Sequence, residues 1–242
     1  MRKAERFRRF LDYFTTHFPE PQTELQYSNP YELIVAVVLS AQCTDKRVNL
    51  VMPELLRHFP TPAHLGAATA EEVYPFIRSV SYPNNKAKHL AGLGKMLMDE
   101  FGGEVPSTIE ELQRLPGVGR KTANVVVSVI YNQPAMAVDT HVFRVSHRLG
   151  LVNRSSTTPL AVEKDLVRYT PETLIPKAHH WLILHGRYIC VARQPKCAVC
   201  PLTDFCKYYA EHFGLSAPDG PGSLTEPKLP PSITDNDAAG TT

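Results

Sequence analysis

LPGVGRKTA, at residues 115–123, is the stretch that decides how this 242-residue sequence folds. Pro116 cannot continue a helix that arrives from 107–114, because its ring removes a backbone donor and clashes with the preceding turn. Gly117 and Gly119 permit a tight turn, and a second helical pattern begins directly after them. The stretch is therefore predicted to be a hairpin between two helices.

The amides of such a hairpin and of the helix start that follows it point outward together, which forms an anion site. A helix–PGVG–helix order is typical of the helix-hairpin-helix motif, here at about 107–131, which holds a DNA phosphate without reading the base sequence. Its candidate DNA-binding residues are Leu115, Gly117, Val118 and Gly119. A nucleotide-binding loop is excluded, because the spacing G-x-x-x-x-G-K-[ST] is absent.

Two charged residues follow the hairpin. Lys121 lies directly behind it, and Asp139 lies eighteen residues further on, in VDTHVFRV at 138–145. Locally, Lys121 is a counter-charge for a phosphate and Asp139 is the N-cap of a helix. If both face one cleft, the lysine amine can instead act as a nucleophile, and the carboxylate can stabilise positive charge that develops on a sugar. Both interpretations remain open at this level.

Four of the five cysteines have the spacing C-x6-C-x2-C-x5-C, at Cys190, Cys197, Cys200 and Cys206. Four thiolates so close together can surround one metal centre, and nothing suggests the secreted setting in which disulfides form. Zinc and iron–sulfur both remain open, although zinc ribbons usually use two C-x2-C pairs and only one is present. Cys43 is predicted to be a core residue of an apolar helix.

Helical patterns dominate the rest of the sequence, and they predict an all-α fold of about ten helices. The pattern S/T-x-x-E predicts capping boxes at Thr69 and at Ser107. VVVSVI at 125–130 is β-branched, but it continues RKTAN without a break and is predicted to be buried helix. The period of 3.6 residues predicts further helices at 30–42, 45–58, 84–101 and 177–190.

Composition indicates an ordinary globular protein, and a mildly basic body suits a polyanionic partner without establishing one. Hydrophobic residues make up 43% of the chain, and no apolar run reaches the length of about 18 residues that a membrane span needs. The N-terminal stretch has no apolar region like that of a signal peptide, so a cytoplasmic location is expected. Residues 212–242 are rich in Pro and Gly and are expected to be a disordered tail. The net charge of +2 combines an acidic tail with a basic body, which suits DNA.

The hairpin, VDTHVFRV, the cysteine spacing and LSAQCTD at 39–45 occur together in one order. In this the sequence resembles the endonuclease III family of DNA glycosylases over about residues 1–211. The resemblance implies two α-helical domains with a DNA-binding cleft between them. A six-helix domain would span 22–133, and residues 1–21 plus 134–211 would form the domain in which the four cysteines hold a [4Fe–4S] cluster. A monomer that acts on damaged double-stranded DNA, in a bacterial nucleoid, is implied as well.

The resemblance also implies a bifunctional base excision repair activity. Lys121 would attack C1′ of a damaged nucleotide that has been flipped from the stack, and the resulting Schiff base would permit β-elimination 3′ to the lesion. Asp139 would assist the departure of the base and the proton transfers. The implied substrates are oxidised pyrimidines and abasic sites.

Three further residues match DNA-contacting positions of the family. Gln42 would fill the space that the flipped base leaves, although by itself it is an ordinary polar residue at a helix end. His141 would contact DNA, and its alternative is a capping or core histidine. Where the family commonly has a leucine wedge, this sequence has Tyr82, within SVSYPNNKA at 79–87, and a tyrosine can also wedge or stack between bases.

Two alternatives are weaker. Adenine-mismatch glycosylases of the same superfamily often have the tyrosine, but they generally lack the lysine and carry a catalytic glutamate near LSAQCTD. No glutamate occurs here between Glu32 and Glu54, and the tail is too short for their C-terminal recognition domain. A non-catalytic helix-hairpin-helix protein would explain the hairpin but not the combination of Lys121, Asp139 and the cysteines.

Overall fold

The computed structural model describes residues 1–214, and all regular structure within them is helical. It comprises twelve α-helices and two short 3-10 helices: α1 (Lys3–His17), α2 (Pro30–Ser40), α3 (Asp45–His58), α4 (Pro62–Ala67), α5 (Ala70–Ile77), α6 (Pro83–Phe101), α7 (Ile109–Leu112), α8 (Arg120–Tyr131), α9 (Thr140–Leu149), α10 (Pro159–Tyr169), η1 (Glu172–Leu174), α11 (Ile175–Tyr188), η2 (Cys197–Val199) and α12 (Lys207–Phe213). The all-α fold is thus confirmed. The segment expected to be a tail, 212–242, overlaps the last two residues of α12, and residues 215–242 lie outside the described residues.

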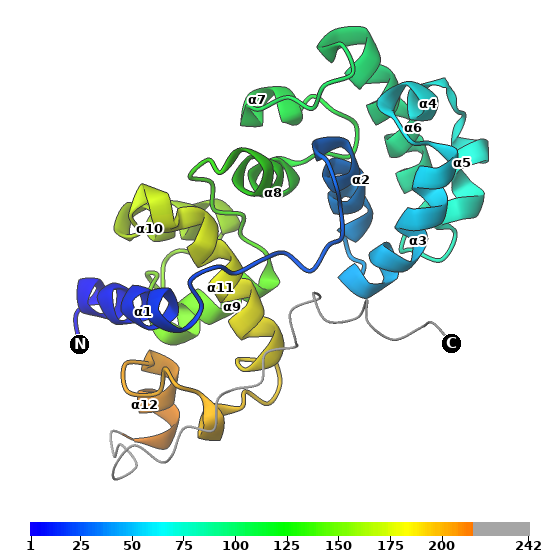
Figure 1. Ribbon diagram of the computed structural model, residues 1–242. Helices are drawn as coiled ribbons and strands as arrows, with labels where there is room; N and C mark the ends of the chain where they lie inside the picture. Colours follow the sequence, from blue (N-terminus) through cyan, green and yellow to red (C-terminus); the bar gives the residue numbers. More distant parts are fainter. Residues whose placement is uncertain (215–242) are drawn as a thin grey trace, which may run out of the picture.

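The helices form two hydrophobic cores. The first core is built by α2 to α8, and α2 lies at its centre, with every residue of 33–39 buried. This explains why α2 is apolar all round instead of amphipathic. The second core is built by α1, α9, α10 and α11 around Trp181, against which Phe10 and Phe14 pack. Figure 1 shows α3 to α6 on one side of the molecule and α1 and α9 to α12 on the other, with α8 between them.

One predicted capping box is confirmed and the other is wrong by one residue. Thr69 Oγ1 accepts from the Glu72 amide at 3.3 Å, and the Glu72 carboxylate accepts from the Thr69 amide at 2.8 Å. At the second site the N-cap is Thr108, not Ser107, and Thr108 Oγ1 accepts from the amide of residue 111. The stretch STIEE fits both registers locally, and burial of Leu112 selects the second.

The β-branched segment at 125–130 lies inside α8, which confirms that it is helix. The end of α2 differs from the prediction. The helix stops at Ser40, because the backbone of Ala41 leaves the helical conformation and Gln42 is left-handed. Cys43 therefore lies in the turn beyond the helix, where it is only partly buried against the first core. No helix in residues 1–214 is both long enough and apolar enough to cross a membrane.

Candidate functional site

Lys121 and Asp139 line the same small cavity, of about 60 Å³, although they belong to different helices. Lys121 is exposed in the first turn of α8. Asp139 is the N-cap of α9, where its Oδ1 accepts from the Val142 amide at 2.7 Å. The N-cap interpretation of Asp139 is therefore confirmed, yet it occupies only one of the two carboxylate oxygens. Asp139 therefore caps α9 and also lines the cavity that contains Lys121.

Two adjacent histidines of α11, His179 and His180, line the same cavity. Burial, together with the nearby charges of His180 and Lys121, lowers the pKa of His179 well below its usual value. Burial and Arg187 lower the pKa of His180 to about 4. Both rings are therefore neutral near pH 7, so the wall beside Lys121 is uncharged. Sequence reasoning missed this pair, because HHW within an apolar helix resembles any buried helical segment.

An ion-pair network also lines this cavity. Arg187 of α11 donates to Asp45 at the start of α3, at 2.6 Å, and also to Glu24. Burial alone would lower the pKa of Arg187, but its two carboxylate partners outweigh burial and raise it. Tyr188 donates to Glu24 as well. The network joins α11, in the second core, to α3 and the segment before α2, and no motif in the sequence signalled it.

The two basic residues after the hairpin have different surroundings. Arg120 donates two hydrogen bonds to Glu163 of α10, at 2.6 and 3.1 Å, and this carboxylate raises the pKa of Arg120. Lys121 lines the cavity. Arg120 therefore connects α8 to α10, while Lys121 faces the cavity. The sequence RK does not reveal this difference.

The hairpin is shaped by one glycine and leaves space around the other. Gly117 is left-handed, with φ of 81°, and a Cβ there would lie 2.9 Å from His89 Cβ. Gly119 is the N-cap of α8, and a Cβ on it would meet no atom within 4 Å. Leu115 and Val118 are only 2% and 6% exposed. Their side chains belong to the first core, so their predicted contact with DNA would be made by the backbone.

Gln42 and Tyr82 lie next to each other on separate segments and share a rare backbone conformation. Both are left-handed, with φ of 54°, which costs a non-glycine residue about 1–3 kcal/mol. Ser81 Oγ donates to the Gln42 carbonyl at 2.6 Å. Gln42 is exposed, and Tyr82 is 62% exposed despite its aromatic ring. Strain and exposure together are typical of functional positions, and neither can be read from the sequence.

His141 lies in the first turn of α9 and lines a larger cleft of about 690 Å³ with Thr44 and Lys46 of the first core's surface. Its ring is partly buried, Gly186 of α11 packs against it, and Arg144 contacts its Nδ1 at 3.2 Å. Both earlier interpretations of His141 are therefore compatible with its position, because it packs between two helices and also faces the cleft.

The four cysteines lie in the loop between α11 and α12. Cys190 follows α11, Cys197 is the first residue of η2, Cys200 is the C-cap of η2, and Cys206 is the N-cap of α12. Arg148 of α9 anchors this loop. Its guanidinium lies 3.5 Å from Cys190 Sγ and donates to two loop carbonyls, each at 2.7 Å, while Cys206 Sγ contacts its carbonyl at 3.5 Å.

The four thiols fit an iron–sulfur cluster. Burial raises the pKa of Cys200 to about 12, and it also raises the pKa of Cys197 and of Cys206; neighbouring cysteines add to each shift. The cysteines thus lie near enough to influence one another, and metal binding must displace their protons. Within residues 1–214, no three His, Cys, Asp or Glu side chains approach as closely as the ligands of a single ion do. A cluster of several irons needs the wider arrangement.

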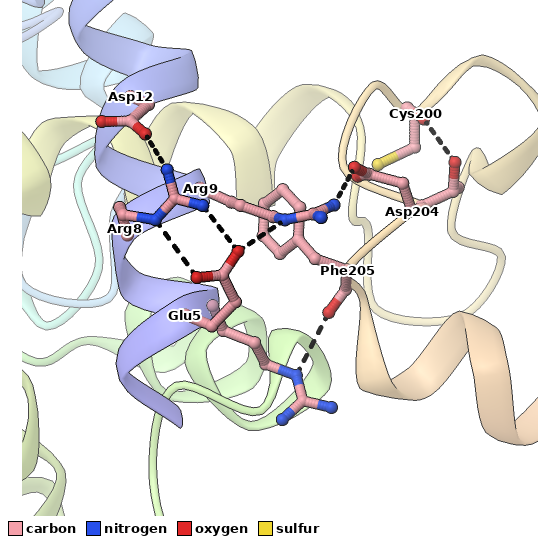
Figure 2. A network of polar contacts seen from close by, with 9 residues as sticks. Glu5, Arg8, Arg9, Asp12, Cys200, Asp204 and Phe205 are labelled. Atoms are coloured by element: carbon pink, nitrogen blue, oxygen red, sulfur yellow. Dashed lines mark hydrogen bonds and ion pairs between the residues drawn. The ribbon is translucent and has the colours of Figure 1, made fainter. Parts of the chain in front are cut away.

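The N-terminal helix holds the cysteine loop in place through the polar network of Figure 2. Arg9 forms an ion pair with Asp204 at 2.7 Å, and Arg6 Nε donates to the Phe205 carbonyl at 3.2 Å. Glu5 accepts from Arg9 at 3.1 Å and orients it toward the loop. Residues near both ends of the described chain therefore build one unit.

Two segments match known families. Residues 35–172 match the HhH-GPD superfamily base excision DNA repair protein, and residues 190–206 match the iron-sulfur binding domain of endonuclease III. The endonuclease III of Bacillus subtilis is 50% identical over 197 residues, which are 81% of this chain and 90% of that protein. That of Rickettsia prowazekii is 44% identical over 211 residues (87% and 99%), and that of Escherichia coli K12 is 41% identical over 208 residues (86% and 97%).

The fold is also similar to solved structures over most of the chain. A trapped endonuclease III–DNA covalent intermediate superimposes with a TM-score of 0.82 at 46% identity, over 87% of this chain and 99% of that one. A non-covalent endonuclease III–DNA complex gives the same TM-score at 45% identity, over 87% and 98%. The chain therefore belongs to the endonuclease III family, the base excision repair DNA glycosylases with AP lyase activity that carry a [4Fe–4S] cluster.

Proposed function

We propose that Lys121 and Asp139 carry the chemistry of this DNA glycosylase and lyase. The observation behind this assignment is that both line one cavity, with Asp139 oriented by its N-cap hydrogen bond. The Lys121 amine would form a bond to C1′ of the flipped nucleotide while the glycosidic bond breaks and the base leaves. Asp139 would balance the positive charge that develops on the sugar.

After the base has left, the bond between C1′ and the ring oxygen breaks, and C1′ forms a Schiff base with Lys121. Removal of a C2′ proton then expels the 3′ phosphate, which is the β-elimination step. The neutral His179 and His180 add no positive charge beside the lysine. A protonated pair there would oppose the formation of the iminium, so we assign both histidines the role of keeping this wall uncharged.

The hairpin would hold the DNA backbone. Because Gly119 has no side chain, no side-chain oxygen caps the first amides of α8, and these amides suit a phosphate. The space around Gly119 would let the phosphate approach closely. Gln42 and Tyr82 would enter the duplex where the damaged nucleotide leaves it, and His141 would contact the strand from the larger cleft.

We assign the four ligands of the [4Fe–4S] cluster to the cysteine loop, at Cys190, Cys197, Cys200 and Cys206. The cluster supplies structure, since base excision and β-elimination require no electron transfer. Two separate hydrophobic cores support a division into a domain at 22–133 and a domain at 1–21 with 134–211. We further propose a monomer that acts near the bacterial nucleoid.

Borohydride trapping on duplex DNA with thymine glycol tests the Schiff-base assignment. The protein is expected to form a covalent adduct, because reduction converts the imine to a stable amine. A duplex with an adenine–guanine mismatch serves as the control and should give little adduct. A folded, cluster-containing protein that binds the lesion but gives no adduct would refute the assignment.

Arg187→Met tests whether the ion-pair network supports the site. The variant leaves Glu24 and Asp45 without their cation in a partly buried setting. We expect a loss of about 1–3 kcal/mol in the free energy of unfolding, measured by denaturation, and slower excision. The matched control is Arg154→Met, which breaks an exposed pair with Glu211 and should cost less than about 1 kcal/mol. Equal losses in both variants would contradict a special role for the network.

A further inference from the structure

We propose that Lys86 is a positioning residue that locks Gln42 and Tyr82 into one rigid unit for entry into the DNA duplex. The inference rests on the role proposed above for Gln42 and Tyr82, and it adds the residue that makes them act together. Neither the motifs nor the sequence patterns pointed to Lys86.

Lys86 is a lysine in the interior of the protein. It lies in the first turn of α6 and is only 5% exposed. Its Nζ donates to the Leu39 carbonyl at 2.8 Å and to the Ala41 carbonyl at 2.7 Å. Both carbonyls lie at the C-terminal end of α2, where a helix lacks internal partners for its last oxygens. The ammonium group also suits the negative end of the helix dipole.

These bonds join the two segments that carry Gln42 and Tyr82. Ala41 directly precedes Gln42, so Lys86 holds the backbone on one side of Gln42. On the other segment, the Lys86 amide donates to the Tyr82 carbonyl at 3.1 Å. The bond from Ser81 to the Gln42 carbonyl closes the arrangement. Lys86 and Ser81 therefore connect both left-handed residues from opposite sides.

The strained backbone explains why such a lock is needed. A glutamine and a tyrosine released from these contacts would leave the left-handed region for more favourable conformations. Side chains that must replace a stacked nucleotide bind best when their positions are set in advance, because ordering them at the moment of binding costs affinity. No residue of α6, which carries Lys86, lines the cavity of Lys121 and Asp139. The lock should therefore act on extrusion of the nucleotide and not on the chemistry.

The test compares two substrates in the Lys86→Met variant, which keeps the length of the side chain but removes its charge and donors. Single-turnover excision of thymine glycol from duplex DNA is expected to fall on the order of ten- to a hundredfold. Cleavage at a preformed abasic site should change by less than about threefold, because no base must be unstacked there. Fluorescence of a 2-aminopurine beside the lesion should show reduced extrusion. The control is Lys95→Met, an exposed lysine of the same helix.

Three further variants separate the possible failures. Ser81→Ala removes the second connection from a partly buried position and should reproduce the substrate-selective loss even if Lys86→Met does not fold. If Gln42→Ala and Tyr82→Ala leave excision unchanged, the proposed role of that pair fails. If they slow excision while folded Lys86→Met and Ser81→Ala match the control, only the inference about Lys86 is overturned. Equal losses on both substrates would overturn it as well.

Discussion

The Lys121→Ala variant is expected to lose base excision and strand cleavage by on the order of 10⁴-fold or more, while still binding lesion DNA. Without the amine, no covalent bond to C1′ can form, and the cavity offers no second primary amine, since Lys121 is its only lysine among the described residues. Binding should persist, because the hairpin amides that we propose to hold the phosphate belong to the backbone.

The measurement has two parts, which are strand cleavage under single-turnover conditions and affinity for duplex DNA with a stable abasic analogue. Loss of one cation should weaken binding modestly and reduce its salt dependence by about one unit of slope. Lys164→Ala, on the exposed face of α10, is the control and should cleave normally. Strand cleavage by Lys121→Ala at a rate near that of the unmodified protein would remove Lys121 as the nucleophile.

The Cys200→Ser variant is expected to lose the broad absorption at about 400 nm that is typical of iron–sulfur clusters, together with its iron. The loop has little else to hold it, because only Leu202 and Phe205 bury large side chains between η2 and α12. Since metal binding at such a site contributes directly to folding, the melting temperature should fall by on the order of 10 °C.

Absorption, iron analysis and thermal unfolding measure this result together. Cys43→Ser is the matched control, because Cys43 lies outside the loop and packs only partly against the first core. That variant should keep its iron and its absorption. Freshly purified unmodified protein that contains one zinc and no iron would contradict the assignment of the cluster.

Much of the candidate site was predictable because its signals are short-range. A proline and two glycines between two helical patterns favour a hairpin, and the cysteine spacing places four possible metal ligands in one loop. The N-cap position of Asp139 was equally local, and the structure confirms it. The choice between Ser107 and Thr108 was not predictable, because both fit the same local pattern and only the packing of Leu112 separates them.

Other features depend on which helices meet. Nothing in RK distinguishes Arg120, which binds Glu163, from Lys121, which lines the cavity. The burial of Leu115 and Val118 likewise follows from their place against the first core. The same holds for Lys86. In the sequence it resembles any surface lysine, and only the fold brings it to the carbonyls at the end of α2.

The sequence by itself determined the helical fold, the hairpin, the cysteine loop and the N-cap position of Asp139. Each of these depends on neighbours within a few positions along the chain, where backbone geometry and hydrogen-bonding partners are set locally. Only the tertiary structure decided that Lys121 and Asp139 share one cavity and that Gln42 and Tyr82 stand together. Those relations depend on how α2, α6, α8, α9 and α11 pack, and packing sums many distant contacts that no single stretch of sequence contains.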